Sequence, residues 1–209
     1  MGCVVESVAR AMDMPDSVFI EDTAVVFDEI AVIARPGVAS RRGETDAVAA
    51  ALARYRRLAA ISAPATLDGG DVLCMGRDVY VGVSGRTNAA GVLQLADIVA
   101  PYGYRVHTVQ TSGCLHLKSA VTAVSDDLLV LNPEWVDGGW FNGLNWVTVD
   151  RAEPFAANVL RVGDSVLCPA SAPRTRTRLE GCGLNVRSVD LSELAKAEGA
   201  LTCCSLILR

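Results

Sequence analysis

The sequence has few histidines, no paired cysteine motif, no excess of basic residues and no long apolar run. Only two histidines, His107 and His116, occur in 209 residues, so few ligand sets exist for a zinc site. Seven cysteines stand at positions 3, 74, 114, 168, 182, 203 and 204, and no two have C-x-x-C spacing. This odd number, without a secretory leader, indicates reduced thiols and predicts a cytoplasmic protein.

The remaining absences exclude two classes of partner. The formal net charge is -5, whereas a nucleic-acid partner requires clustered Lys and Arg. We interpret the alternating Arg174, Arg176 and Arg178 as a solvated face rather than a phosphate-binding patch. No apolar stretch approaches the roughly 18 residues that span a bilayer. Ser7 stands one place too late for N-myristoylation after Met1-Gly2-Cys3, so we expect neither a nucleic-acid nor a membrane partner.

The residues that are present predict one globular α/β domain with an internal repeat. Apolar residues make up 51% and charged residues 21% of the chain, and no linker divides it, so we treat residues 1–209 as a single domain. Four segments, spaced by roughly 40–50 residues, each contain two short β-like runs joined by a Gly or Asp turn. These segments are 18–33, 71–83, 120–131 and 158–168.

Helical patterns lie between these hairpins. They cover residues 43–60 and 87–99, and a short one begins at Ser192 and ends at Gly199. Each unit therefore consists of a hairpin, a helix and a strand that leads to the next unit. Because such a unit cannot bury its own apolar face, the copies must pack around a shared axis. We expect a closed α/β array with polar residues at the strand ends near that axis, and a loop over residues 134–145.

The histidines and the C-terminal cysteines are candidates for chemistry. His107 lies in an alternating strand-like stretch and is expected at the surface. His116 has apolar neighbours on both sides, so alternation places its imidazole on the opposite face; a structural core histidine is the alternative. Cys203 and Cys204 would point to opposite faces of a strand and could not chelate one metal, so no metal is expected. Cys204 is interpreted as a packing residue, with a redox or metal-sensitive role as the alternative.

Carboxylates gather at turns beside small residues. They are Asp16, Glu21-Asp22 and the two acids of Asp68-Gly69-Gly70-Asp71. Glycines next to an acid allow a ligand or a neighbouring strand to approach the backbone closely. The alternative is turn chemistry, in which Asp accepts hydrogen bonds from its own backbone. The carboxylates alone do not decide between the two.

Taken together, these pieces resemble the dimethylarginine dimethylaminohydrolase family. Six motifs occur in the family's order and span nearly the whole chain. They are Pro15–Ala24, Arg35–Gly37 with Ser40–Glu44, Ala65–Leu73, Ser84–Asn88, Leu115–Ser119 and Leu201–Ser205. Any one of them is a weak signal, whereas six in order are specific.

The resemblance implies a fold and a set of residue roles. The fold would be the pentein, a pseudo-five-fold α/β-propeller, with about four of its modules present. The activity would be hydrolysis of Nω-methylated arginine to citrulline, without a cofactor, and a homodimer is possible. The roles implied are nucleophile for Cys203, general acid/base for His116, orientation of the imidazole for Asp68, guanidinium binding for Glu21 and Asp22, α-ammonium binding for Asp16, α-carboxylate binding for Arg41 and Arg86, and a backbone contact for Ala197.

The chemistry accounts for these residue types. A guanidinium is cationic and a poor electrophile. Opposed carboxylates fix its plane through charge-assisted hydrogen bonds worth roughly 1.5–3 kcal/mol each. A thiolate, favoured by an adjacent imidazolium or by the cationic substrate, attacks the central carbon. The imidazole protonates the departing amine, which leaves a covalent thiouronium, and then activates water to release citrulline.

The sequence also departs from the family. Only 14 residues precede Pro15, where the family carries roughly one more module. We expect residues 4–12 to be a short helical remnant of it, in either a fragment or a natural shortened relative with an open ring. Two alternatives stay open: another guanidine-modifying pentein, such as an arginine deiminase or amidinotransferase, and a non-catalytic binding protein. Neither the preferred methylarginine nor a place in nitric oxide regulation or catabolism can be deduced.

Overall fold

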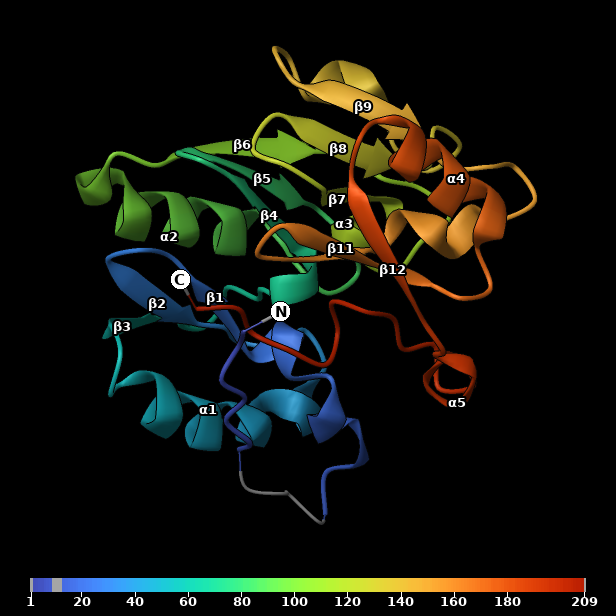
Figure 1. The fold of residues 1–209 in the computed structure, drawn as a ribbon. Helices are drawn as coiled ribbons and strands as arrows, with labels where there is room; N and C mark the ends of the chain where they lie inside the picture. Colours follow the sequence, from blue (N-terminus) through green and yellow to red (C-terminus); the bar gives the residue numbers. More distant parts are fainter. Residues whose placement is uncertain (1, 9–12, 209) are drawn as a thin grey trace.

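The fold consists of four small sheets that follow one another along the chain. The structure is a computed structural model that describes residues 2–8 and 13–208 (Figure 1). Each sheet contains an antiparallel hairpin whose second strand also pairs in parallel with a third strand. The strands are β1 (Ala24–Val26), β2 (Ile30–Ile33) and β3 (Arg57–Ala60); β4 (Val72–Met75), β5 (Asp78–Gly82) and β6 (Arg105–Val109); β7 (Val121–Ala123), β8 (Leu128–Leu131) and β9 (Asn145–Thr148); β10 (Leu160–Val162), β11 (Ser165–Pro169) and β12 (Asn185–Val189).

The parallel pairing in each sheet requires a crossover connection, which usually contains a helix. Three crossovers use α1 (Thr45–Leu52), α2 (Ala89–Val99) and α4 (Pro173–Gly181), and the third sheet uses the short η6 (Gly138–Trp140). The Asn88 side chain caps α2 by accepting a hydrogen bond from the Gly91 amide. The remaining elements of the crossovers and of the C-terminal region are η3 (Ala39–Glu44), η5 (Ala100–Tyr102) and α5 (Ser192–Ala195).

A turn of helix precedes every hairpin. These turns are η1 (Pro15–Val18) and η2 (Ile20–Thr23) before β1, η4 (Gly69–Asp71) before β4, α3 (Leu117–Ala120) before β7, and η7 (Pro154–Ala157) before β10. A fifth turn, residues 201–204, precedes the irregular segment 205–208. The repeat therefore delivers a short helical turn to the same place in every unit.

Apolar clusters between neighbouring sheets hold the units together. Phe27, Leu67, Val79 and Leu95 belong to a buried cluster shared by the first two sheets. Full burial of one such side chain contributes about 1.5–3 kcal/mol. Similar clusters join the second sheet to the third and the third to the fourth. Three of the four clusters therefore join two units each, as the repeat predicts, whereas the buried residues of the fourth all come from the first unit.

The four sheets surround a common axis. The first strand of each sheet (β1, β4, β7 and β10), together with segment 205–207, lines one central cavity of about 310 Å³. Leu206 also packs against the cluster formed by β1, β2 and α1, and Figure 1 shows the C-terminal segment beside β1. The array of units around a shared axis is thereby confirmed.

The expected elements and the observed ones differ at a few places. The first hairpin begins at Ala24 rather than Val18, because residues 15–23 form η1 and η2. The helix expected over 43–60 ends at Leu52, since residues 57–60 pair with β2. Helix α4 was not expected, because only Thr175 and Leu179 on it are buried. Segment 134–145 is a loop around η6, as predicted.

Two further expectations concern the N-terminus and the cysteines. The helix expected over residues 4–12 is wrong for residues 4–8, which are irregular, and residues 9–12 lie outside the described residues. No disulfide joins the seven cysteines, all of which are among the described residues. Within residues 2–8 and 13–208, no helix combines the length and apolarity needed to cross a membrane.

Candidate active site

The candidate site lies where the helical turns meet, and two glycines allow that meeting. A Cβ atom on Gly69 would overlap the carbonyl oxygen of Glu21 in η2. A Cβ atom on Gly70 would lie 2.8 Å from both Asp22 Oδ1 and His116 Nδ1. Instead, the Gly70 amide donates to Asp22 Oδ1 at 3.1 Å. The glycines of the sequence motif therefore serve the close approach of η2, η4 and the His116 segment.

His116 is buried beside two carboxylates. It occupies the cap position before α3 and is only 8% exposed. Its Nε2 lies 3.2 Å from Asp68 Oδ2, and Asp68 Oδ1 accepts the Gly37 amide at 2.9 Å. Its Nδ1 lies 3.8 Å from Asp22 Oδ1. Asp68 thus fixes one ring nitrogen, and the other faces Asp22.

The surroundings of His116 favour its protonated form. Burial alone would lower the pKa of His116, but the hydrogen bond that its ring donates to Asp68 and the charges of Asp22, Asp71 and Asp68 raise it above its usual value. An imidazolium among carboxylates can give a proton to a leaving group.

Cys203 approaches the same acidic turn from the C-terminal segment. Its carbonyl oxygen accepts the Glu21 amide at 3.0 Å, and its side chain is half-buried. Burial and the negative charges of Glu21 and Asp22 raise the pKa of the Cys203 thiol to about 12. Cys203 therefore holds its proton until a positive charge arrives. Residues 201–204 form a turn rather than a strand, so the expected opposite-face arrangement of Cys203 and Cys204 does not apply.

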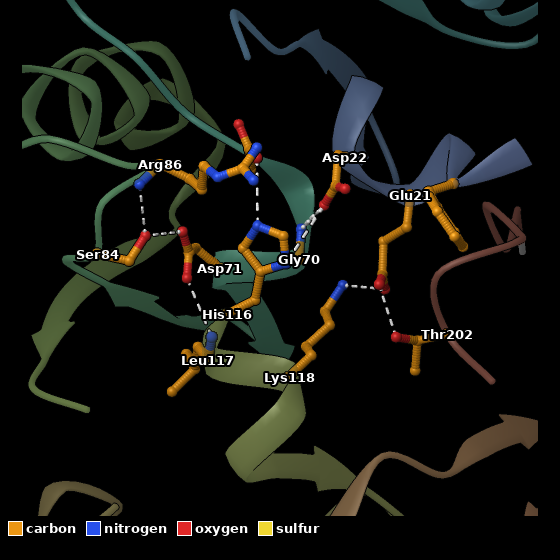
Figure 2. A network of polar contacts seen from close by, with 12 residues as sticks. Glu21, Asp22, Gly70, Asp71, Ser84, Arg86, His116, Leu117, Lys118 and Thr202 are labelled. Carbon is orange, nitrogen blue, oxygen red and sulfur yellow. Dashed lines mark hydrogen bonds and ion pairs between the residues drawn. The ribbon is translucent and has the colours of Figure 1, made fainter. Parts of the chain in front are cut away.

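Glu21 differs from the expectation that it faces the guanidinium. Its Oε1 accepts Lys118 Nζ at 2.8 Å, and its Oε2 accepts the Thr202 hydroxyl at 2.6 Å (Figure 2). Thr202 in turn exchanges two hydrogen bonds with the side chain of Asn158. Glu21, Lys118 and Thr202 also line the axial cavity. Glu21 therefore links η2, α3 and the turn at residues 201–204. Asp22 is the acid of η2 that faces His116.

Arg41 also differs from its expected role as a carboxylate anchor. It is buried, and its guanidinium donates to Asp22 Oδ2 at 2.6 Å, to both oxygens of Glu44, and to the carbonyl oxygens of Asp16 and Phe19. Of its five N–H donors, these contacts leave too few for a bidentate pair with a ligand. Arg41 therefore pairs with Asp22 and compensates its buried charge, and its part in substrate binding stays a prediction.

The other predicted residues lie at the rim. Arg86 is half-buried, and Figure 2 shows its side chain extending toward the His116 side of the site. Asp16 is exposed on η1, and Ala197 is exposed after α5. A Cβ atom on Gly199 would lie 2.6 Å from Phe19 Cε1, so the Ala197 segment packs against the end of η1. Asp16 and Ala197 are thereby brought to one side of the site.

One group of side chains has the geometry of a metal site. Single ligand atoms of Asp22, Asp68 and His116 lie within 4.8 Å of one another. Asp22 is paired with Arg41, and Asp68 is hydrogen-bonded to His116, so protein groups already compensate both charges. That the protein needs no metal stays a prediction.

The sequence reading assigned no role to five polar residues at the site. They are Glu44, Asp71, Lys118, Asn158 and Thr202. Four of these, Glu44, Asp71, Lys118 and Thr202, stand inside the quoted motifs, and that position was the only available signal. Lys118, Asn158 and Thr202 have partners in other units, so no spacing in the sequence links them, whereas Glu44 pairs with Arg41 three residues away.

Comparisons with known proteins agree with this geometry. The family model described as "Arginine deiminase" matches residues 6–158. A dimethylarginine dimethylaminohydrolase of Streptomyces coelicolor is 45% identical over 95% of this chain and 77% of its own length. The corresponding protein of Pseudomonas aeruginosa is 36% identical over 92% of this chain and 76% of its own length.

A solved structure shows the same fold. It is the Pseudomonas aeruginosa enzyme, a cysteine-to-serine mutant in complex with citrulline, and it superposes with a TM-score of 0.88 at 34% identity. The match covers 92% of this chain and 76% of that one. The four ββαβ units described above are therefore modules of the pentein type.

Proposed function

The chain belongs to the dimethylarginine dimethylaminohydrolase family, and on that premise we propose that it hydrolyses Nω-methylated L-arginine to L-citrulline and a methylated amine. The reaction breaks a C–N bond of a linear amidine. The observation that carries the proposal is that both groups adjoin one acidic turn, η2. His116 Nδ1 lies 3.8 Å from Asp22 of η2, with Nε2 held by Asp68, and the Cys203 carbonyl oxygen accepts the Glu21 amide of η2.

The protonation states fit a reaction started by a cationic substrate. In the free protein, Cys203 is a thiol, since burial and nearby carboxylates raise its pKa to about 12. A guanidinium placed against Asp22 offsets that negative charge and lowers the cost of forming the thiolate. A carboxylate offers about four acceptor positions. Asp22 uses two of them, for Arg41 and the Gly70 amide, and two remain for the substrate.

Two chemical steps follow. As the guanidinium binds, the Cys203 thiol releases its proton to solvent, the thiolate sulfur bonds to the guanidinium carbon, and the amine leaves with a proton from the His116 imidazolium. The neutral imidazole then takes a proton from water, and the resulting hydroxide oxygen bonds to the thiouronium carbon. The C–S bond breaks, the new hydroxyl group gives its proton to the departing sulfur, and citrulline leaves with the thiol restored. Asp68 keeps the ring in place through both steps.

The rest of the substrate is a free amino acid. Arg86 pairs with the α-carboxylate, and Asp16 and the Ala197 carbonyl meet the α-ammonium. Arg41 acts on the substrate indirectly, because it holds Asp22 in place through their ion pair. The half-buried guanidinium of Arg86 at the rim suits a carboxylate.

Citrulline formation from dimethylarginine tests the proposal. Cys203→Ser removes the nucleophile, and we expect a loss of at least about 10³-fold in turnover with an unchanged fold. Cys182→Ser is the matched control, because Cys182 is exposed. Full activity of the Cys203 variant would refute the covalent mechanism. Faster release of ammonia from arginine than of dimethylamine would favour a deiminase, and binding without citrulline a non-catalytic protein.

The proposal also covers where the protein acts and whether it forms a dimer. The reduced cysteines support a cytoplasmic site of action. The family resemblance leaves a homodimer open, and sedimentation at several concentrations tests it. A mass that stays at the 22.0 kDa of the chain would exclude the homodimer.

A further inference from the structure

One fully buried carboxylate near the site has no part in the reaction described above. Asp71 in η4 is 0% exposed. Its Oδ1 accepts the Leu117 amide at 3.0 Å, and its Oδ2 accepts the Ser84 hydroxyl at 2.6 Å (Figure 2). The two oxygens therefore hold two segments that lie far apart in the sequence.

The first segment carries Arg86. Ser84 Oγ accepts the amides of Arg86 at 3.0 Å and Thr87 at 3.2 Å, and the Ser84 amide donates to the Thr87 carbonyl at 3.1 Å. Both acceptor positions of the hydroxyl are thus filled, and its single proton goes to Asp71. Asp71 consequently fixes the hydroxyl that shapes the backbone of Arg86.

The second segment carries His116. Leu117, whose amide Asp71 binds, directly follows His116 and is fully buried. A Cβ atom on Gly82 would lie 3.2 Å from Asp71 Oδ1 and 3.0 Å from Leu117 Cβ, so β5 packs tightly behind this contact. The backbone that aims the imidazole has little freedom to move.

The arrangement requires a carboxylate rather than an amide. Both Asp71 oxygens accept hydrogen bonds, whereas asparagine has one acceptor and one donor group. Burial of the charge is costly and raises the pKa of Asp71 above its usual value. Such a cost is tolerated in folded proteins where the group's hydrogen bonds serve a specific arrangement.

We propose that Asp71 is a positioning residue that fixes the general acid/base His116 and the carboxylate anchor Arg86 at a set separation. It joins the reacting end of the site to the end that holds the amino-acid group of the substrate. The inference rests on the proposed function. Its consequence is that one side chain governs both the protonation of the leaving amine and the fit of the α-carboxylate.

Two variants test the two arms separately. Ser84→Ala breaks only the anchor arm, so we expect KM for dimethylarginine to rise about tenfold with kcat nearly unchanged. Asp71→Asn breaks both arms, so KM should rise similarly and kcat should fall about 10- to 100-fold. Thr175→Val is the control for a buried polar loss, because Thr175 is 0% exposed and lies in the fourth unit.

The pH profile separates positioning from mere loss of structure. The charge of Asp71 helps to keep the proton on His116 and so raises the pKa of His116. In Asp71→Asn, the decline of kcat at alkaline pH should therefore move to lower pH, and in Ser84→Ala it should stay in place. Kinetic constants are expressed per Cys203 thiol that reacts with a mechanism-based label, which corrects for unfolded protein.

Several outcomes would overturn the inference. Unchanged constants in Asp71→Asn, or an equal loss of kcat in Thr175→Val, would do so. If Asp71→Asn does not fold, an unchanged KM in Ser84→Ala still overturns it. Failure of the wild-type protein to form citrulline is a different result, since it would refute the proposed function itself.

Discussion

The two histidines of this protein both contact an aspartate, yet their surroundings are opposite. His107 on β6 lies with Nε2 2.7 Å from Asp78 Oδ1, its side chain is 45% exposed, and its ring stacks on Tyr80. His116 is farther from its aspartate, at 3.2 Å, but is buried among three carboxylates. The shorter contact therefore belongs to the histidine without a role in the site.

Solvent and neighbouring charge explain the difference. Arg105 also binds Asp78 and compensates its charge, and water screens the whole surface cluster. At His116 little water is present, and the carboxylates act on the ring through a medium of low dielectric constant. Burial among several carboxylates, rather than proximity to one acid, makes an imidazole useful for proton transfer.

The largest difference between His116 and His107 should appear in kcat when each imidazole ring is removed. We expect His116→Asn to lower kcat by about 10²–10⁴-fold, because the leaving amine loses its proton donor. His107→Asn should change kcat less than about twofold. Citrulline release measured under saturating dimethylarginine compares them, and similar losses in the two variants would contradict the assignment.

A smaller change at the buried cluster tests its tight packing. In Gly70→Ala, the new Cβ would press on His116 Nδ1 and Asp22 Oδ1, so we expect kcat/KM to fall about 100-fold. Gly181→Ala is the control, since nothing lies within 4 Å of a Cβ at that position. Wild-type rates in Gly70→Ala would mean that the cluster can spread without cost.

The pH dependence of the wild-type protein sharpens the same comparison. Because the pKa of His116 is raised, its imidazolium persists above the ordinary value of about 6.5, and kcat should decline only as pH rises through the higher value. The stability contributed by this charged ring is fully present below the pKa of the unfolded state. It is lost as pH rises through the higher pKa of the folded protein. NMR titration of the two imidazoles, with signals assigned by means of His107→Asn, measures the pKa of His116. A midpoint for His116 below 6.5 would refute the prediction.

The smallest effect is expected at the surface. Loss of the exposed contact between His107 and Asp78 should change the free energy of unfolding by less than about 1 kcal/mol. Urea titrations of His107→Asn and the wild-type protein at neutral pH give this difference. A change above about 2 kcal/mol would show that the stacking on Tyr80 contributes more than an exposed pair does.

Much of the fold could be predicted from local patterns. The Gly or Asp turns expected within segments 71–83 and 158–168 belong to the hairpins β4–β5 and β10–β11 of the structure. Residues 15–23 were misread, because short 3-10 turns have no hydrophobic period of their own. Helix α4 was missed for a similar reason, as its exposed arginines conceal a narrow apolar stripe.

The candidate site was predicted less completely than the fold. Asp68 and His116 do meet as expected from the family motifs. The substrate-binding roles expected for Glu21 and Arg41 stay predictions, and the sequence did not indicate that Lys118 would pair with Glu21, or Glu44 and Asp22 with Arg41. No pattern along the chain encodes that choice, because each partner except Glu44 comes from a distant segment.

The sequence alone determined the repeated unit, the turns that join the two strands of a hairpin and the identities of the reactive groups, since these depend on neighbouring residues. Only the tertiary structure decided which groups stay charged and which face a ligand. Burial and electrostatic pairing act through space, and turns from distant segments of the chain meet at one axis. Asp71 illustrates this: its local signal is that of a turn residue, whereas its two oxygens join segments 13 and 46 positions away.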